Sequence, residues 1–143
     1  MKREKLLGHE LKAIDNLIVR RMNAILSAHG AEDVTPMHGM ILGYLHDKRG
    51  AEIYQRDIEA EFHITRSTVT SILKLMEKKG YIKRESVACD ARLKRITATS
   101  LGEDTFHRID SSIRQTEAAI RSALAPSEYE QLFAMLGKIK SAL

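Results

Sequence analysis

Hydroxyl and cationic side chains share one side of a short segment between residues 65 and 79. If the segment is a helix, that side carries Arg66, Ser67, Thr70, Ser71 and Lys74. Arginine can bond guanine or a phosphate, and the short Ser and Thr side chains let a helix backbone approach base edges closely. Lysine further along is better placed for phosphates. These residue types predict a helix that enters the major groove of DNA.

The opposite side of the segment predicts a buried face. Val69, Ile72, Leu73 and Met76 recur at the i, i+3, i+4 and i+7 spacing of a helix. The alternative is an ordinary surface helix, but such a face favours Glu, Lys, Gln and Ala. Four hydroxyl residues in the first six positions, with Thr68 among them, give up helix propensity and favour the DNA interpretation.

A basic hairpin is predicted directly after this helix. Residues 81–86 and 93–97 alternate apolar and polar side chains, as strands do, with a loop at 87–91 between them. Its cations are Lys83, Arg84, Arg92, Lys94 and Arg95. Such a wing can follow the DNA backbone or insert an arginine into the minor groove.

Asp90 lies two positions before Arg92, close enough for its carboxylate to orient the guanidinium. The alternative is a surface ion pair worth about 0–1 kcal/mol. Residues 63–95 hold nine basic and three acidic side chains, a net charge of +6, whereas the whole chain carries +4. This local excess indicates a polyanionic partner, although a solvated basic face would give the same count. The candidate DNA contacts are Gln55, Thr65, Arg66, Ser67, Thr68, Thr70, Ser71, Lys74, Arg84, Asp90, Arg92 and Lys94.

The elements that must position these residues are mostly helices. Apolar periodicity predicts helices over 4–28, from Thr35-Pro36 to about Asp47, over 55–62 and 65–79, from Ser100 to about 123, and over 127–143. Ala51-Glu52-Ile53 can form a short extended piece. The three-residue turn 63–65 joins two of the helices as in a helix-turn-helix, with Thr65 as N-cap. The fold class is therefore mainly α with a small β-hairpin wing.

We expect the chain to have three functional segments. The 143 residues fit one compact domain or one domain with helical extensions. We expect a helical dimerisation segment at 1–34, a winged helix-turn-helix DNA-binding segment at 35–99, and further dimerisation helices at 100–143. The apolar stripes of the outer segments exceed what a small helix-turn-helix can cover, so we expect a second copy to cover them. The sequence shows no membrane span or signal peptide, and we expect a cytoplasmic protein.

Several motifs together resemble the MarR family, the multiple-antibiotic-resistance-type winged helix-turn-helix regulators. These motifs are Thr35-Pro36-Met37, the run RSTVTSILKLMEKKGYIKR (66–84), DARLKRI (90–96) and Thr99-Ser100-Leu101-Gly102. The resemblance covers almost the whole chain. Two positions depart from the family pattern. Tyr54 stands where a small Ser or Thr cap is common, and His63 stands where the turn often has Gly.

The resemblance implies a homodimer that binds pseudo-palindromic operator DNA, usually as a repressor. It assigns base reading to Ser67, Thr68 and Thr70, and it makes Arg92 the wing arginine with Asp90 as its supporting acid. It also implies a small effector, often an aromatic acid, in a cleft beside the DNA-binding lobe. Arg20, His38, Met40 and Tyr44 are candidate ligand contacts, although Met and Tyr at helical spacing are also typical of a core.

Other functions remain open at this point. Branches of the family sense oxidants or zinc. The single cysteine, Cys89, lies in the wing, where it could be a reactive thiol or an unremarkable exposed one. The six histidines include no HxxxH pair, so no metal site or cofactor is predicted, although a metal site assembled from distant positions stays open.

No Gly-rich phosphate loop, nucleophile elbow or HExxH indicates an enzyme. A winged-helix protein-interaction module is a further alternative, but it would not need a basic, hydroxyl-rich face.

Overall fold

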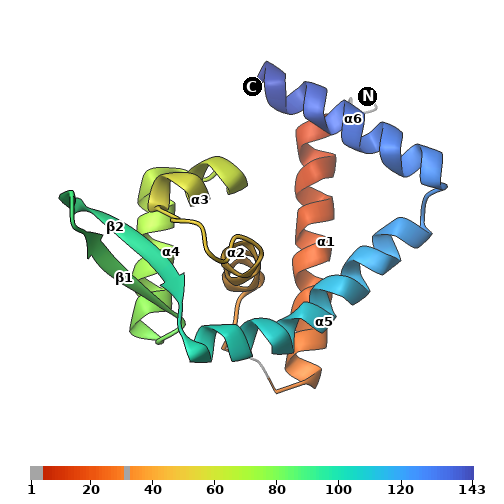
Figure 1. The fold of residues 1–143 in the computed structure, drawn as a ribbon. Helices are drawn as coiled ribbons and strands as arrows, with labels where there is room; N and C mark the ends of the chain where they lie inside the picture. The colour runs from red at the N-terminus through yellow and green to blue at the C-terminus, as the bar shows by residue number, and fades with distance from the viewer. Residues whose placement is uncertain (1–4, 31–32) are drawn as a thin grey trace. The chain divides into compact units, whose positions relative to one another are not determined.

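The computed structural model describes residues 5–30 and 33–143 (Figure 1). Helices α1 (Leu7–Ala28), α2 (Pro36–Asp47), α3 (Gln55–Phe62) and α4 (Arg66–Lys78) precede strands β1 (Ile82–Val87) and β2 (Asp90–Ala98), and helices α5 (Ser100–Ser122) and α6 (Pro126–Ala142) follow. The predicted fold class is confirmed: the described part of the chain is mainly helical with one antiparallel hairpin. Within the described ranges, no helix has the length and apolarity needed to cross a membrane.

The chain divides into two compact units. One, called the winged unit here, is Asn23–Asp110; the other, called the helical unit, combines Met1–Met22 with Ser111–Leu143. Helices α1 and α5 contribute to both units. The predicted segments 1–34, 35–99 and 100–143 are functional divisions, and they stay a prediction.

The core of the winged unit holds helix α4 in place. Ile41, Ile58, Val69, Leu73 and Met76 are fully buried, and they come from α2, α3 and α4. The turn between α3 and α4 is tight because His63 adopts a left-handed conformation at φ 51° and ψ 45°. Histidine tolerates this region less readily than glycine. The departure at His63 therefore leaves the helix-turn-helix intact.

Main-chain and carboxylate contacts, rather than a small cap residue, secure the start of α3. Tyr54 is the N-cap residue, and its main-chain N–H donates to the Asp57 carboxylate at 2.8 Å. The phenol of Tyr54 donates instead to Glu52 at 2.8 Å. Asp57 thus supplies the N3 half of a capping box, in which a carboxylate accepts from the main-chain N–H of the N-cap residue.

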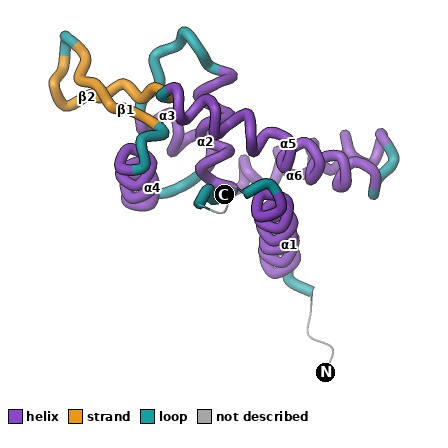
Figure 2. The backbone as a smooth tube through the Cα atoms, turned by 90° about the horizontal axis from the view of Figure 1, so that it is seen from below, coloured by secondary structure: helices purple, strands orange, loops and turns teal. Residues whose placement is uncertain are grey.

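The hairpin, called the wing here, extends beyond helices α2 to α4 in Figure 2. Its strands pair from Ile82 opposite Ala98 to Ser86 opposite Lys94, and then Val87 lies opposite Asp90. The predicted loop at 87–91 was wrong, because the strands continue to Val87 and resume at Asp90. The extra residues of β2 form a bulge inside the ladder instead of a longer loop.

The start of α1 and the cap of α4 also differ from the prediction. The predicted start of the first helix at residue 4 lies outside the described residues, and the helix begins at Leu7. Thr65 is the N-cap residue of α4, but its side chain caps no main-chain N–H. Its Oγ1 lies 2.9 Å from the Thr68 hydroxyl, so the hydroxyls bond each other.

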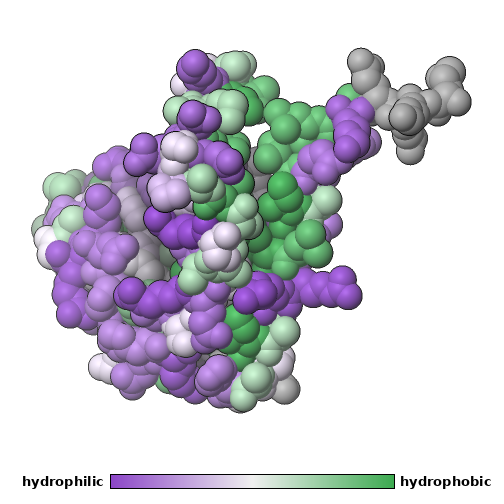
Figure 3. Space-filling view, turned by 90° about the vertical axis from the view of Figure 1, so that its right-hand side faces the viewer, coloured by the Kyte–Doolittle hydropathy of each residue, from purple (hydrophilic) through white to green (hydrophobic). Residues whose placement is uncertain are grey.

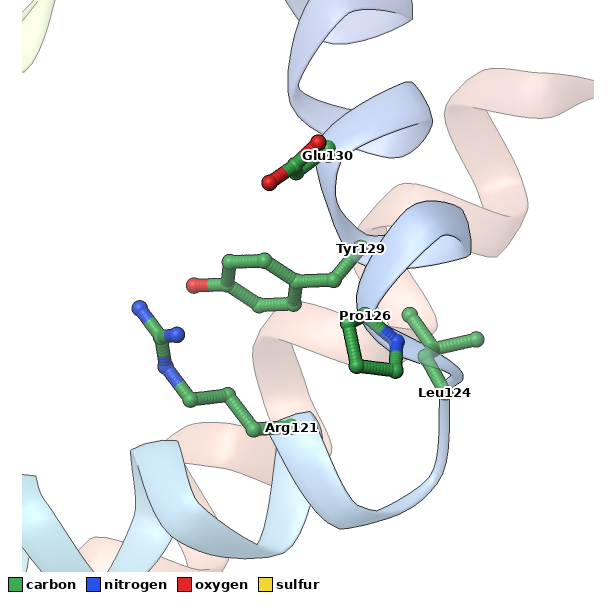
Figure 4. Close-up of a pocket in the computed structure, with 5 residues that line it drawn as sticks. All are labelled: Arg121, Leu124, Pro126, Tyr129 and Glu130. Carbon is green, nitrogen blue, oxygen red and sulfur yellow. The ribbon is translucent and has the colours of Figure 1, made fainter.

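The helical unit turns sharply where α5 meets α6. Figure 4 shows Arg121 reaching toward the ring of Tyr129 across this corner, with Leu124 and Pro126 at the turn. The guanidinium carbon of Arg121 lies 4.2 Å from the ring centroid. Glu117 bonds both partners, which orients the first turn of α6 on the last turns of α5.

Large apolar side chains remain exposed on the helical unit. Leu17 is 61% exposed and Phe133 is 58% exposed in the single chain. The others are Leu6, Leu7, Leu11, Ile14, Met135 and Leu143. Figure 3 views a face on which hydrophobic surface is widely exposed. Apolar surface of this extent is unusual on a monomer and typical of an interaction face.

Candidate nucleic-acid interface

Helix α4 carries its polar residues outward, as the sequence predicts. Arg66, Ser67, Thr68, Ser71 and Lys74 are exposed, while Val69, Leu73 and Met76 are fully buried. This division follows from the apolar spacing, because burying three residues of one face orients the other face to solvent. The helix therefore presents short side chains with cations at its first residue and further along.

Thr70 differs from the other hydroxyl residues because it is half-buried and already bonded. Its hydroxyl donates to the Arg66 carbonyl at 2.8 Å and accepts from the Gln55 side-chain amide at 2.8 Å. The same amide of Gln55 lies 3.2 Å from the Arg66 carbonyl. Gln55 therefore joins the first residue of α3 to the first turn of α4, and it acts here through positioning.

The structure brings part of the predicted set together around one hollow. A cavity of about 380 Å³ lies between the start of α3, the start of α4 and the wing. Its predicted members are Gln55, Arg66, Arg84, Arg92 and Lys94. Among the residues that the structure describes, the lining includes Glu59 as its single acid, so the hollow carries a strong positive charge. A concave, cationic surface of this kind attracts phosphate groups.

Sequence reasoning missed Arg56, which lines the same hollow. Its guanidinium carbon lies 5.0 Å from the centroid of the Tyr54 ring, which holds the side chain beside the wing. Arg56 follows Gln55 directly, so its place at the start of the short helix was a usable signal. Arg56 lies outside residues 63–95, the range whose net charge indicated a polyanionic partner.

The bulge in β2 explains the exposure of Arg92. One step along β1, from Ser86 to Val87, corresponds to the step from Lys94 back to Asp90 on β2. Arg92 therefore lies outside the regular ladder and is exposed. The Asp90 carboxylate accepts from the main-chain N–H of Arg92 at 2.9 Å. The expected contact with the guanidinium is thus replaced by one that fixes the backbone of the bulge.

Arg84 and Arg95 are bonded within the fold. Arg84 pairs with Glu77, which links β1 to the last turn of α4. Arg95 lies 3.3 Å from Glu85 and 3.9 Å from Glu52. Across residues 5–30 and 33–143, by contrast, no acidic partner is recorded for Arg66, Lys74, Arg92 or Lys94. These four cations are thus available to a polyanion.

The candidate effector contacts fall into different surroundings. Arg20 is an exposed residue of the helical unit, and Met40 is 44% exposed on α2. His38 is buried beside Tyr81 with ring centroids 6.3 Å apart, and Tyr44 packs edge-on against Phe62 at 6.0 Å. Burial raises the pKa of the Tyr44 phenol, with a further increase from Asp57 and Glu61. The recorded aromatic contacts of His38 and Tyr44 are core contacts, and their role toward a ligand stays a prediction.

Comparison with known proteins shows the same architecture elsewhere. A family model described as the MarR family matches residues 32–93. The crystal structure of a Staphylococcus aureus MepR–DNA complex is 28% identical, with a TM-score of 0.86, and the match covers 98% of this chain and 100% of that one.

Two further structures give similar matches. S. aureus MepR in a DNA-binding conformation is 28% identical, with 96% and 98% coverage and a TM-score of 0.81. The transcription regulator MarR from Oenococcus oeni PSU-1 is 28% identical, with 95% and 99% coverage and a TM-score of 0.78. The resemblance therefore extends beyond the winged unit over nearly the whole of each chain.

Proposed function

We propose that this chain, which resembles the MarR family over nearly its whole length, is a transcriptional regulator that binds a specific DNA site as a homodimer. The observation that carries the proposal is the juxtaposition of an exposed, hydroxyl-rich α4 face with a hollow lined by Arg56, Arg66, Arg92 and Lys94. A similar structure, MepR, has been solved in complex with DNA. Binding rather than catalysis is the chemistry that these residues support.

Each part of the interface has a separate task in this proposal. Helix α4 enters the major groove, where Ser67, Thr68 and Ser71 hydrogen-bond base edges. The hydroxyl of Thr70 is already bonded to Arg66 and Gln55, so its methyl group is the part left for a thymine contact. Phosphates bind to Arg66 and Lys74 on the helix and to Arg92 and Lys94 on the wing.

A second copy of the chain covers the exposed apolar residues of the helical unit. A groove of about 230 Å³ lies between Ile14 and Leu17 of α1 and Ala119 and Ile120 of α5, and apolar side chains of a partner fit it. Two-fold symmetry then places two α4 helices about 34–36 Å apart, one turn of DNA. The functional division at 34/35 and 99/100 is part of this proposal, as is action on DNA in the cytoplasm.

We also propose that a small effector controls DNA binding, with repression as the default state. A ligand that binds one arrangement of the dimer better than another shifts the spacing of the α4 helices away from successive grooves. Arg20, His38, Met40 and Tyr44 remain the candidate contacts. Screening small molecules for release of bound DNA tests this part of the proposal.

The central test compares DNA fragments from the region upstream of the protein's own gene with random DNA of equal length. We expect tighter binding to one upstream fragment at physiological salt. Equal affinity for both kinds of DNA would contradict sequence specificity. It would leave a non-specific DNA binder.

A double variant, Arg92→Gln with Lys74→Gln, tests the assigned phosphate contacts. The slope of log K against log salt is negative, and loss of two contacts reduces its magnitude by about 1.8, since each contact contributes about 0.9. Lys138→Gln on α6, which removes one exposed charge outside the interface, is the control and should leave the slope unchanged. If the double variant keeps the wild-type slope, Arg92 and Lys74 do not contact phosphates. A protein-interaction module then becomes the better interpretation of this surface.

A further inference from the structure

Three side chains that commonly bind metals meet where α2 ends and α5 begins, within the winged unit. His46 lies in the last turn of α2, and Glu103 and His107 lie four residues apart near the start of α5. One ligand atom of each residue lies within 4.8 Å of the others. The i, i+4 spacing puts Glu103 and His107 on one face of the helix, and the fold adds His46 from a position 57 residues before Glu103.

Two of these three side chains are already held in place. The ring of His46 packs on Phe106 with centroids 4.7 Å apart and an interplanar angle of 31°. Gly43 allows this packing, because a Cβ there would lie 3.2 Å from the Phe106 ring. Nδ1 of His46 lies 2.9 Å from Oε2 of Glu103. An incoming ion therefore meets two donors that already lie close together, with His46 held by Phe106 and Glu103 held by His46.

The distances suit a first-row transition metal after one small movement. Zinc–nitrogen and zinc–oxygen bonds of about 2.0–2.2 Å put tetrahedral ligand atoms about 3.3 Å apart. His46 and Glu103 are already near that separation, and the exposed His107 side chain can close the remaining distance by rotation. Two imidazoles and one carboxylate match zinc, nickel or copper better than magnesium or calcium.

A competing cation is present, but it is weakly held. Arg49 donates to Glu103 Oε2 at 2.9 Å, and its side chain is 66% exposed. A surface ion pair of this kind contributes about 0–1 kcal/mol. Both recorded contacts of the carboxylate use Oε2. Displacing Arg49, or sharing the carboxylate with it, is a small cost beside the formation of three metal–ligand bonds.

We propose that His46, Glu103 and His107 form a binding site for a divalent first-row transition metal ion, with water completing the coordination. The bound ion would join the last turn of α2 to the first turns of α5. This site is separate from the α4 face and the wing. The proposal therefore does not depend on DNA binding.

The proposal is tested by titrating the tag-free, full-length protein with Zn²⁺ in a non-chelating buffer. Calorimetry measures the binding. Co²⁺ serves as a second probe, because its visible absorption reports nitrogen and oxygen coordination. We expect one ion per chain. Removing one supporting contact behind a metal ligand typically weakens affinity about 10–100-fold. We therefore expect His107→Gln, which removes a ligand, to weaken binding by at least about 100-fold.

The controls separate this site from other donors on the chain. His29→Gln removes an exposed histidine that directly follows α1 and lies outside the cluster, and Cys89→Ser removes the exposed thiol of the wing. Both should bind the ions as the wild type does. His107→Gln decides the matter if changes at the more buried His46 impair folding, since His107 is exposed. Absence of binding in the wild type, unchanged binding in a folded His107→Gln variant, or equal binding of Mg²⁺ would overturn the proposal.

Discussion

Arg92 and Thr70 show how single residues gain their roles from their neighbours. The β2 bulge takes Arg92 out of the strand ladder, and the Asp90 carboxylate fixes the backbone beside it. Thr70 is bonded through its hydroxyl to Gln55 and Arg66, so it differs from the exposed Ser67 although both lie on the outer side of α4. Residue type alone suggested equal roles for Ser67 and Thr70. Local hydrogen bonding distinguishes them.

His38 makes stability depend on pH. Burial lowers its pKa below the usual 6.5, and Lys79 lowers it further. Because the folded state binds this proton less readily than the unfolded state, stability is highest above about pH 6.5 and falls as the pH drops toward the lowered pKa. The slope from one such group is at most about 1.4 kcal/mol per pH unit.

Replacing His38 with Phe should flatten this dependence, because Phe keeps an aromatic ring beside Tyr81 and has no proton to bind. Denaturant unfolding at about pH 7.5 and about pH 5.5 measures the difference. His29→Gln, which alters an exposed histidine, should keep the wild-type slope. An equal loss of stability at low pH in the His38→Phe variant would contradict this assignment.

At the scale of elements, the junction between β2 and α5 depends on Thr99 and Gly102. The Thr99 hydroxyl donates to the Gly80 carbonyl and accepts from the Gly102 N–H at 3.1 Å, and the Thr99 N–H donates to the Tyr81 carbonyl at 3.0 Å. This cap attaches the start of α5 to the turn that follows α4. The Thr-Xaa-Xaa-Gly motif found in the sequence therefore has a structural explanation.

We expect Gly102→Ala to destabilise the protein strongly. A Cβ at this position would lie 2.0 Å from the Tyr81 carbonyl oxygen and 3.2 Å from Leu42, so the backbone must shift. Overpacking of this kind costs about 1–3 kcal/mol or more. Thermal or denaturant unfolding measures the cost.

Gly137→Ala is the matched control within a helix. No atom lies within 4 Å of a Cβ built at Gly137, so alanine should stabilise α6 by about 0.5–1 kcal/mol. Similar changes in stability for the two variants would contradict the packing argument at Gly102.

At the scale of the whole molecule, the exposed apolar residues of the helical unit indicate a protein that is complete only as an assembly. Leu11, Ile14 and Leu17 follow α1 at helical spacing and remain 39%, 52% and 61% exposed. Thr116 lies beside Ile14 and Leu17 on the same groove. Covering these side chains with a second copy removes them from water, which is the main driving force for such association.

Leu17→Glu should disrupt the homodimer. A charge buried in an interface without a partner costs about 3–5 kcal/mol, which corresponds to more than about 100-fold in dissociation constant. Analytical ultracentrifugation over a range of concentrations measures the change. Asn16→Glu adds the same charge at the neighbouring exposed position of α1 and should leave the dimer intact. A monomeric wild type, or a Leu17→Glu variant that associates as the wild type does, would contradict the dimer.

The sequence by itself determined the helices, the hairpin and the identity of the α4 face. These features follow from short-range periodicity, since Val69, Leu73 and Met76 can share a buried face only in a helix that leaves Arg66, Ser67 and Ser71 exposed. Turn chemistry is equally local, because His63 adopts a left-handed conformation at the position where the turn often has Gly. Strand ends were less well predicted, because a bulge and a loop share the same residue types.

Only the tertiary structure decided which distant residues meet. It placed Arg56 beside the wing, paired Arg84 with Glu77, and brought His46 to Glu103 and His107. Local periodicity determines which face of an element is buried, but it does not determine which other element packs against that face. The packing of α2 on α5, and of α3 on the wing, therefore decides which side chains can act together.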